Sequence, residues 1–202
     1  MMVMRSNDDE ADRRRFAAEG LGDFARFDFG RKGRRADGTE VEVAFSLAFA
    51  RSLALPDAGF FVSQQHFPQN FWSPALQVHP NGATGVAGVA LAVETPADHV
   101  EFLRRFVEAA AARVVDGGFI IDVDGSTVEI LTREAATARY GAEARDDNPP
   151  LLVTRIAVAD LAVADEALRA GGVASARRGD ALVVPKSEAF GAVLVFEQAR
   201  PA

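Results

Sequence analysis

The chain has 202 residues, of which 49% are hydrophobic and 25% charged, with a formal net charge of −7 and no cysteine. This composition is typical of a soluble globular protein, and it excludes a disordered chain, a disulfide scaffold and a thiolate metal site. The negative charge argues against a nucleic-acid partner, and the apolar runs are too short to span a membrane. Because the N-terminal residues lack the apolar core of a signal peptide, we expect a cytoplasmic protein.

Residues 1–66 predict a first β-α-β-β-β unit. An apolar strand opens it, Asn7 and Asp8 can cap the helix that follows, and Gly20 is a suitable stop for that helix. Asp37-Gly38 is a dipeptide that closes hairpins, and the run Phe60-Phe-Val-Ser-Gln64 is an apolar strand that ends on a polar residue.

Residues 67–83 form a crossover, and its three prolines prevent the segment from being a helix or a central strand. The segment also holds Phe67, Phe71 and Trp72. These aromatic side chains could line a substrate pocket, or they could form a hydrophobic plug between units.

Residues 84–133 predict a second unit of the same kind. The strand Gly85–Val93 is followed by Thr95 as a helix cap, with Pro96 at the first helical position. Asp124-Gly125 supplies the hairpin turn. We expect His99, in the first turn of the helix, to be solvent-exposed.

Residues 134–150 predict a charged linker with a short helix, and residues 151–198 predict a third unit. In the third unit Asp160 caps the helix, Gly171-Gly172 ends it, and the last strand finishes at Glu197. The pattern recurs with a period of roughly 65 residues, which indicates tandem β-α-β-β-β units.

Several local sequences resemble the glyoxalase-like domain family of the vicinal oxygen chelate superfamily, which includes glyoxalase I, extradiol dioxygenases and bleomycin-resistance proteins. They are Phe60-Phe-Val-Ser-Gln-Gln-His66 with Pro68, Phe71-Trp72 and His79-Pro-Asn-Gly82, then Asp37–Phe45 and Phe190–Glu197. The resemblance covers nearly the whole chain. It implies an α+β fold of tandem units whose curved mixed sheets form a cup with the helices outside, and it says little about the reaction.

The resemblance also implies where a metal would be held. Members of the superfamily take ligands from the first and last strands of each unit, and the last-strand positions fall on Gln64, Glu129 and Glu197. The first-strand positions fall on Met1 or Met2, Gly88 and Val153, which are not metal ligands. The resemblance thus implies a divalent metal as the possible cofactor. Because the first-strand ligands are missing, we expect no ion to be held by four side chains of a single chain.

Two groups of residues are candidates for the site. Glu129 and Glu197 are the candidate catalytic residues, because a carboxylate desolvated in the cup could act as a general base; alternatively each faces solvent beyond its strand. Gln64 and His66 lie on one side of a strand, and His79 follows the crossover. With Phe71 and Trp72 they are candidate substrate-binding residues. The histidines could bind a metal, or they could only hydrogen-bond the loop backbone.

The leading interpretation is a glyoxalase-like protein that binds a small oxygen-bearing organic molecule in its cup, as a metal-dependent lyase, isomerase or dioxygenase. The alternative is a non-catalytic protein that sequesters a small molecule and has no metal site. The missing first-strand ligands favour the binder, whereas the polar line Gln64, His66, Glu129 and Glu197 favours the enzyme.

A homodimer is also expected. In the superfamily that the chain resembles, cups are built from units in pairs, and the chain has three. Either the chain is a shortened version, or its unpaired unit joins that of a partner chain. One strand face of the first unit is apolar at alternate positions, namely Val41, Val43, Phe45, Leu47 and Phe49. A second copy of the chain is the commonest cover for such a surface, so we predict an interface through the first unit.

Overall fold

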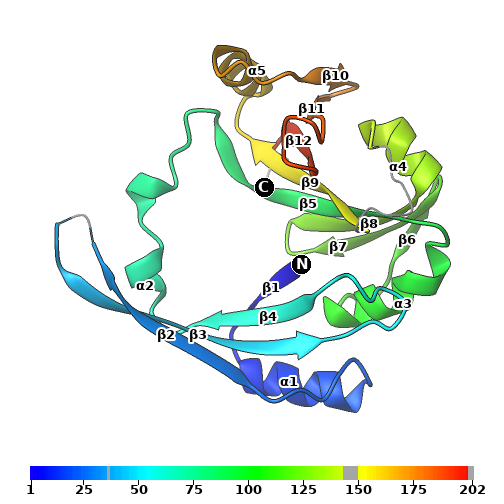
Figure 1. The fold of residues 1–202 in the computed structure, drawn as a ribbon. Helices are drawn as coiled ribbons and strands as arrows, with labels where there is room; N and C mark the ends of the chain where they lie inside the picture. Colours follow the sequence, from blue (N-terminus) through cyan, green and yellow to red (C-terminus); the bar gives the residue numbers. More distant parts are fainter. Residues whose placement is uncertain (36, 143–149, 200–202) are drawn as a thin grey trace. The chain divides into compact units, whose positions relative to one another are not determined.

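The computed structural model describes residues 1–35, 37–142 and 150–199. The chain divides into two compact parts, each described by itself below. The N-terminal body comprises Met1–Gln77 with Arg105–Val107, and the C-terminal body comprises Val78–Arg104 with Glu108–Ala202. Figure 1 labels the elements of both.

The N-terminal body contains a four-stranded sheet in the order β1-β4-β3-β2. Its elements are β1 (Met2–Ser6), α1 (Asp9–Ala18), β2 (Phe27–Arg34), β3 (Glu40–Ala50), β4 (Phe60–Gln65), α2 (Pro68–Phe71) and the 3-10 turn η1 (Pro74–Leu76). β1 and β4 are parallel, and the other pairs are antiparallel. Of the two predicted caps, Asn7 and Asp8, it is Asp8 that caps α1, because its carboxylate accepts a hydrogen bond of 3.0 Å from the Ala11 N–H.

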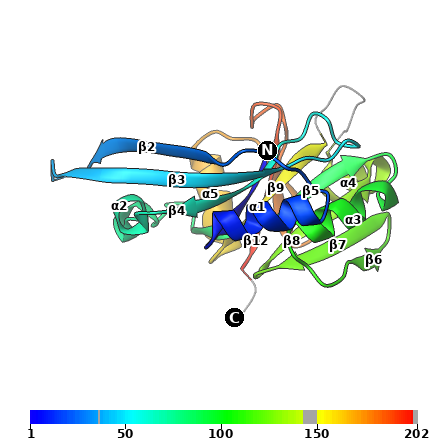
Figure 2. The same ribbon diagram turned by 90° about the horizontal axis from the view of Figure 1, so that it is seen from below.

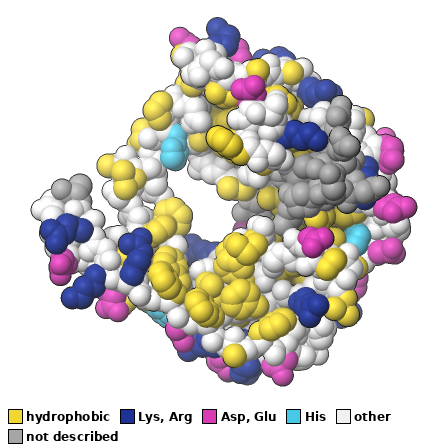
Figure 3. Space-filling model, viewed as in Figure 1, with side chains coloured by type: hydrophobic (Ala, Val, Ile, Leu, Met, Phe, Trp, Pro, Cys, Tyr) yellow, Lys and Arg dark blue, Asp and Glu magenta, His cyan; other side chains and the backbone are white. Residues whose placement is uncertain are grey.

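The two faces of this sheet are covered differently. α1 lies against β3 and β4 (Figure 2), and its Phe16 stacks on Phe106, which meets Phe60 edge to face. We call this side the α1 face. On the other side Phe45 contacts Phe71 of α2 edge to face, with ring centroids 5.7 Å apart. Hydrophobic side chains gather over β3 and β4 on this second side (Figure 3).

The C-terminal body contains an eight-stranded sheet in the order β10-β11-β12-β9-β5-β8-β7-β6. The strands of its first half are β5 (Ala83–Val93), β6 (Arg113–Val115), β7 (Gly118–Val123) and β8 (Ser126–Thr132). Those of the second half are β9 (Leu151–Val158), β10 (Ala176–Arg178), β11 (Ala181–Val184) and β12 (Val193–Gln198).

All three β-α-β-β-β units have the same pairing, because the last strand of each is parallel to the first: β4 with β1, β8 with β5 and β12 with β9. The antiparallel pair β5 and β9 joins the second unit to the third. The predicted fold class, tandem β-α-β-β-β units in mixed sheets, is therefore confirmed.

Helices cover both faces of the eight-stranded sheet. α5 (Leu161–Ala170) packs on Leu182, Val184 and Phe196. α4 (Arg133–Tyr140) is the short helix predicted in the linker, and its Ala136 and Tyr140 pack in a second cluster with Leu131, Val153 and Val195. We call these sides the α5 face and the α4 face. The rest of the predicted linker, residues 143–149, lies outside the described residues.

The expectation for His99 was wrong. The residue lies in α3 (Ala97–Phe106) and is only 9% exposed. It precedes Leu103 and Phe106 by four and seven positions, so helical periodicity puts all three on one buried face. Desolvation lowers the pKa of His99 below its ordinary value, against the opposing charge of Asp98.

No helix in the described part of the chain is long and apolar enough to cross a membrane.

Candidate functional site

A network of charged groups lies on the α4 face of the eight-stranded sheet, centred on the buried Arg155 of β9. The guanidinium donates through Nε and Nη2 to the two carboxylate oxygens of Glu197, at 2.9 and 2.7 Å. Its Nη1 donates to Glu129 Oε1 and to Thr127 Oγ1, each at 2.6 Å. Arg155 is 5% exposed, so these are charge-assisted bonds in a largely dry environment.

The sheet register explains how three separate strands deliver these groups. Thr127, Gly88 and Arg155 are neighbours on β8, β5 and β9. Glu129 lies two residues beyond Thr127, and therefore on the same face. Gly88 lies between Arg155 and Thr127 in this register, and only glycine fits there, because a Cβ would lie 2.3 Å from the Thr127 carbonyl oxygen and 2.9 Å from its Oγ1.

Helix α4 completes the network. Glu129 Oε2 accepts hydrogen bonds from the Tyr140 hydroxyl at 2.8 Å and from Arg139 Nη1 at 3.0 Å. Desolvation and the charge of Glu129 raise the pKa of Tyr140, so the phenol stays a neutral donor. The positive charges of Arg139 and Arg155 balance the negative charges of Glu129 and Glu197.

Arg155 keeps its charge within this network. Desolvation by burial lowers the pKa of Arg155, but the hydrogen bond to Glu197 and the surrounding negative groups outweigh it and raise the pKa above its ordinary value. The cluster is therefore a closed set of ion pairs rather than a pair of isolated carboxylates.

The structure thus brings the two predicted carboxylates together through a residue that the sequence analysis missed. The resemblance placed the first-strand position of the third unit at Val153, whereas Arg155 occupies the next position on the same face. A signal was present, because Arg155 is the only charged residue in strand β9, whose other residues are apolar apart from Thr154.

These residues do not fit a divalent metal. Arg155 engages both oxygens of Glu197 and one oxygen of Glu129, and α4 engages the other. Gly88 leaves no room for a ligand side chain on β5. In the described ranges, no three His, Asp or Glu side chains gather into a group that could hold a metal ion.

In the N-terminal body, Gln64 and His66 lie on the α1 face. Gln64 Oε1 accepts a hydrogen bond of 3.1 Å from the backbone N–H of Asp9, at the start of α1. His66 Nε2 lies 2.6 Å from Ser46 Oγ, which also contacts Asp28 Oδ1 at 2.5 Å. Because the single hydroxyl proton of Ser46 goes to the Asp28 carboxylate, Nε2 of His66 is assigned as the donor, and His66 is not placed to act as a base toward Ser46.

His79 is exposed in the C-terminal body, in the loop before β5, so the two candidate histidines belong to different bodies. Their shared metal site stays a prediction.

A one-residue difference in register separates Gln64 from Glu197. Glu197 alternates with Val193 and Val195, which pack on the α4 face, away from α5. Gln64 alternates with Phe60, which packs on the α1 side. The last-strand side chain that points away from the helix in the first unit is therefore Gln65.

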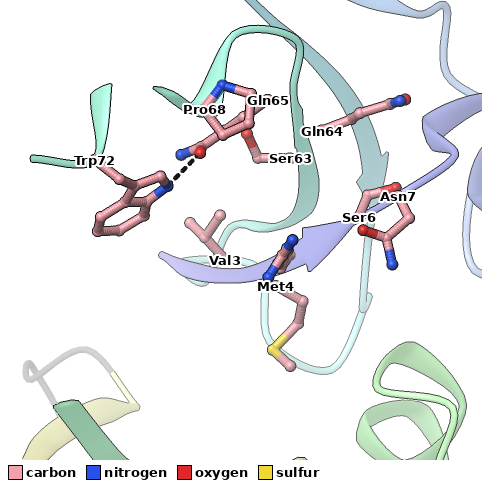
Figure 4. A pocket seen from close by; sticks show the side chains of 10 residues that line it. Val3, Met4, Ser6, Asn7, Ser63, Gln64, Gln65, Pro68 and Trp72 are labelled. Carbon is pink, nitrogen blue, oxygen red and sulfur yellow. Dashed lines mark hydrogen bonds between the residues drawn. The ribbon is translucent and has the colours of Figure 1, made fainter. Parts of the chain in front are cut away.

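A pocket of about 670 Å³ lies beside β1 and β4 (Figure 4). Its lining includes Val3, Arg5, Ser63, Gln65, Pro68 and Trp72. The indole of Trp72 is directed toward Gln65 (Figure 4), and its Nε1 donates a hydrogen bond of 2.5 Å to Gln65 Oε1. Arg5 is exposed and has no hydrogen-bond or ion-pair partner in the described part of the chain.

A second pocket of similar volume lies between the β2–β3 hairpin and α2 with η1. Its lining includes Arg31, Arg34, Arg35, Phe71, Trp72 and Leu76. Arg35 donates a hydrogen bond of 2.7 Å to Asn70 Oδ1, which ties α2 to the hairpin. Of the predicted aromatic residues, Phe71 lines this pocket and Trp72 lines both.

The model of the glyoxalase-like domain family matches residues 1–107 of this chain. A search of curated proteins gave no match. Among solved structures, a hypothetical protein from Staphylococcus aureus superposes with a TM-score of 0.59 at 10% identity, covering 96% of this chain and 63% of that one. This chain therefore spans less than two thirds of the length of that relative.

Two shorter structures are also similar. A methylmalonyl-CoA epimerase from Mycobacterium tuberculosis is 14% identical, with a TM-score of 0.46, and the match covers 61% of this chain and 93% of that one. A glyoxalase/bleomycin resistance protein/dioxygenase from Nocardioides is also 14% identical, with a TM-score of 0.28, and the match covers 64% of this chain and 88% of that one. At these identities the likeness concerns the fold alone. Because the family model covers more than half of the chain, the chain belongs to the glyoxalase-like domain family.

Proposed function

We propose that this protein binds a small organic molecule with a carboxylate or similar oxygen-rich group in the pocket beside β1 and β4, and that it does so without a metal. The observation that carries the proposal is the cation of Arg5, which lines this pocket and is not neutralised by another described group. The cavity of about 670 Å³ suits a small organic ligand.

The lining supports a ligand with one charged end and one apolar end. The guanidinium of Arg5 is suited to bind a carboxylate with two parallel hydrogen bonds. Ser63 offers a hydroxyl, and Gln65 offers an amide N–H₂ that has no partner among the described residues, while its oxygen is bonded to Trp72. Val3 is 48% exposed and Trp72 52%, so both offer apolar surface to the rest of the ligand.

The non-catalytic alternative is favoured over a metal-dependent lyase, isomerase or dioxygenase. In such an enzyme, the carboxylates of Glu129 and Glu197 would have to be free to bind a metal or take a proton. Both are engaged by Arg155 instead. We therefore assign no reaction step to them.

Arg5→Gln is expected to weaken ligand binding by about 10- to 100-fold, because a hydrogen bond to a charged group contributes about 1.5–3 kcal/mol. Trp72 is the only tryptophan of the chain, so its fluorescence reports directly on the pocket. The measurement is a fluorescence titration of EDTA-treated protein with aliphatic and aromatic carboxylates, beginning with benzoate.

The matched control is Arg14→Gln, which removes an exposed arginine on α1 whose partner is Glu10. The control should bind as tightly as the unmodified protein. Equal affinities of Arg5→Gln and Arg14→Gln, or no fluorescence response to any carboxylate of the panel, would contradict the proposal.

We also propose that the protein is a homodimer through the N-terminal body. Phe45 and Phe49 are covered in part within the body by Phe71 and Phe61. Phe27 and Phe29 pair with Leu47 and Phe45 in the sheet, and they remain 51% and 46% exposed on that apolar face. A second copy would remove this surface from water.

Sedimentation velocity at micromolar concentration should therefore detect a dimer, and Phe29→Glu should shift the protein to the monomer because a carboxylate would be buried in the interface. Phe190→Glu, at a fully exposed position of the C-terminal body, is the control and should leave the dimer intact. A monomer at every concentration would refute the dimer.

A further inference from the structure

The carboxylates of Glu129 and Glu197 face the side of the sheet where the fold family would hold a metal, and a side chain of this chain lies between them. We propose that the guanidinium of Arg155 takes the place of a divalent cation there. The eight-stranded sheet then carries a binding site for an organic cation, and the side chain of Arg155 occupies that site. The inference is independent of the pocket beside β1.

The geometry of the surrounding acceptors matches a planar fork rather than a spherical ion. Glu197 takes two parallel bonds from Nε and Nη2, at 2.9 and 2.7 Å. Nη1 bridges Glu129 and Thr127 on the other side. The acceptors are thus arranged at the edges of one guanidinium plane, whereas a divalent metal needs oxygen atoms converging on a single point.

The backbone positions of these acceptors do not depend on the side chain of Arg155. Thr127 and Glu129 belong to β8, and Glu197 belongs to β12, so sheet hydrogen bonds fix the backbone of each. The carboxylate of Glu129 is also held by Tyr140 and Arg139. Removal of the Arg155 side chain should therefore leave a cradle of the right shape for a free guanidinium ion.

Rescue of an Arg155→Ala variant tests this directly. Guanidinium or methylguanidinium chloride at low millimolar concentration should raise the melting temperature of Arg155→Ala by several degrees relative to the same concentration of sodium chloride. The unmodified protein should show no such rise. In the double variant Arg155→Ala/Glu197→Gln, the rescue should be lost, because the carboxylate that accepts two parallel hydrogen bonds is gone.

Manganese and zinc ions test the opposite possibility, that the site binds a divalent metal. We expect neither ion to stabilise Arg155→Ala as guanidinium does, and neither to bind the unmodified protein stoichiometrically in calorimetric titration. If Arg155→Ala does not fold, that titration of the unmodified protein still decides. Stoichiometric metal binding that Glu129→Gln abolishes, or rescue of Arg155→Ala by metal but not by guanidinium, would overturn the proposal.

Discussion

Arg155→Met is expected to lower the free energy of unfolding by about 3–5 kcal/mol, because it breaks the buried Arg155–Glu129 ion pair and removes the partner of the half-buried Glu197. Methionine keeps much of the apolar stem of arginine, so the loss reports on the ion pairs rather than on an empty cavity. Glu197 loses both of its bonds from Arg155, and Glu129 keeps only those from α4. Urea unfolding followed by circular dichroism measures the effect.

The control for this variant is Arg169→Met. Arg169 pairs with Asp165 on the surface of α5 at 2.9 Å, and an exposed pair of this kind contributes less than about 1 kcal/mol. Adding Glu197→Gln to Arg155→Met should restore part of the stability, because the unpaired charge is then removed. A loss in Arg155→Met no larger than in Arg169→Met would show that the network is not a buried ion-pair cluster.

Phe16→Ala is expected to destabilise the N-terminal body by about 3–5 kcal/mol, the usual cost of truncating a buried phenylalanine. Its side chain is fully buried, and its ring stacks on Phe106 with centroids 5.8 Å apart. The truncation therefore removes apolar contacts and opens a cavity between α1 and the sheet. Trp72 lies in the same body, so its fluorescence during urea unfolding reports on this part of the chain.

Phe29→Ala serves as the comparison, since it removes an identical ring that is nearly half exposed in the same body. Its cost should remain below about 1 kcal/mol, provided that it is measured at a concentration where the oligomeric state is unchanged. Similar losses in the two variants would argue against α1 packing on this sheet through Phe16.

The fold could be predicted because its determinants are local. Asp124 and Gly125 both have positive φ angles, 39° and 77°, as the tight hairpin between β7 and β8 requires, and the dipeptide itself predicts that turn. Asp160 likewise caps α5, with its carboxylate accepting from the Ala162 N–H at 2.8 Å. Repeated three times, such signals define the order of strands and helices.

The site was harder to predict because its determinants are not local. Whether Gln64 or Gln65 points away from the helix depends on a register set by α1 and by pairing with β1, and an error of one residue reverses the face. The network around Arg155 requires β9, β5 and β8 to be adjacent, although they come from two different units. Sequence periodicity contains no information about that adjacency.

The side-by-side placement of Gly88 and Arg155 has a consequence for how such a protein could change during evolution. To acquire a metal centre on this sheet, a lineage would need a ligand on β5, where a Cβ collides with Thr127, and it would need to lose the arginine on β9. Either step alone leaves an overcrowded strand or an unpaired buried charge, each at a substantial cost in stability. The metal-binding form and the arginine-filled form of this sheet are therefore separated by intermediates of low stability, unless substitutions on neighbouring strands occur together.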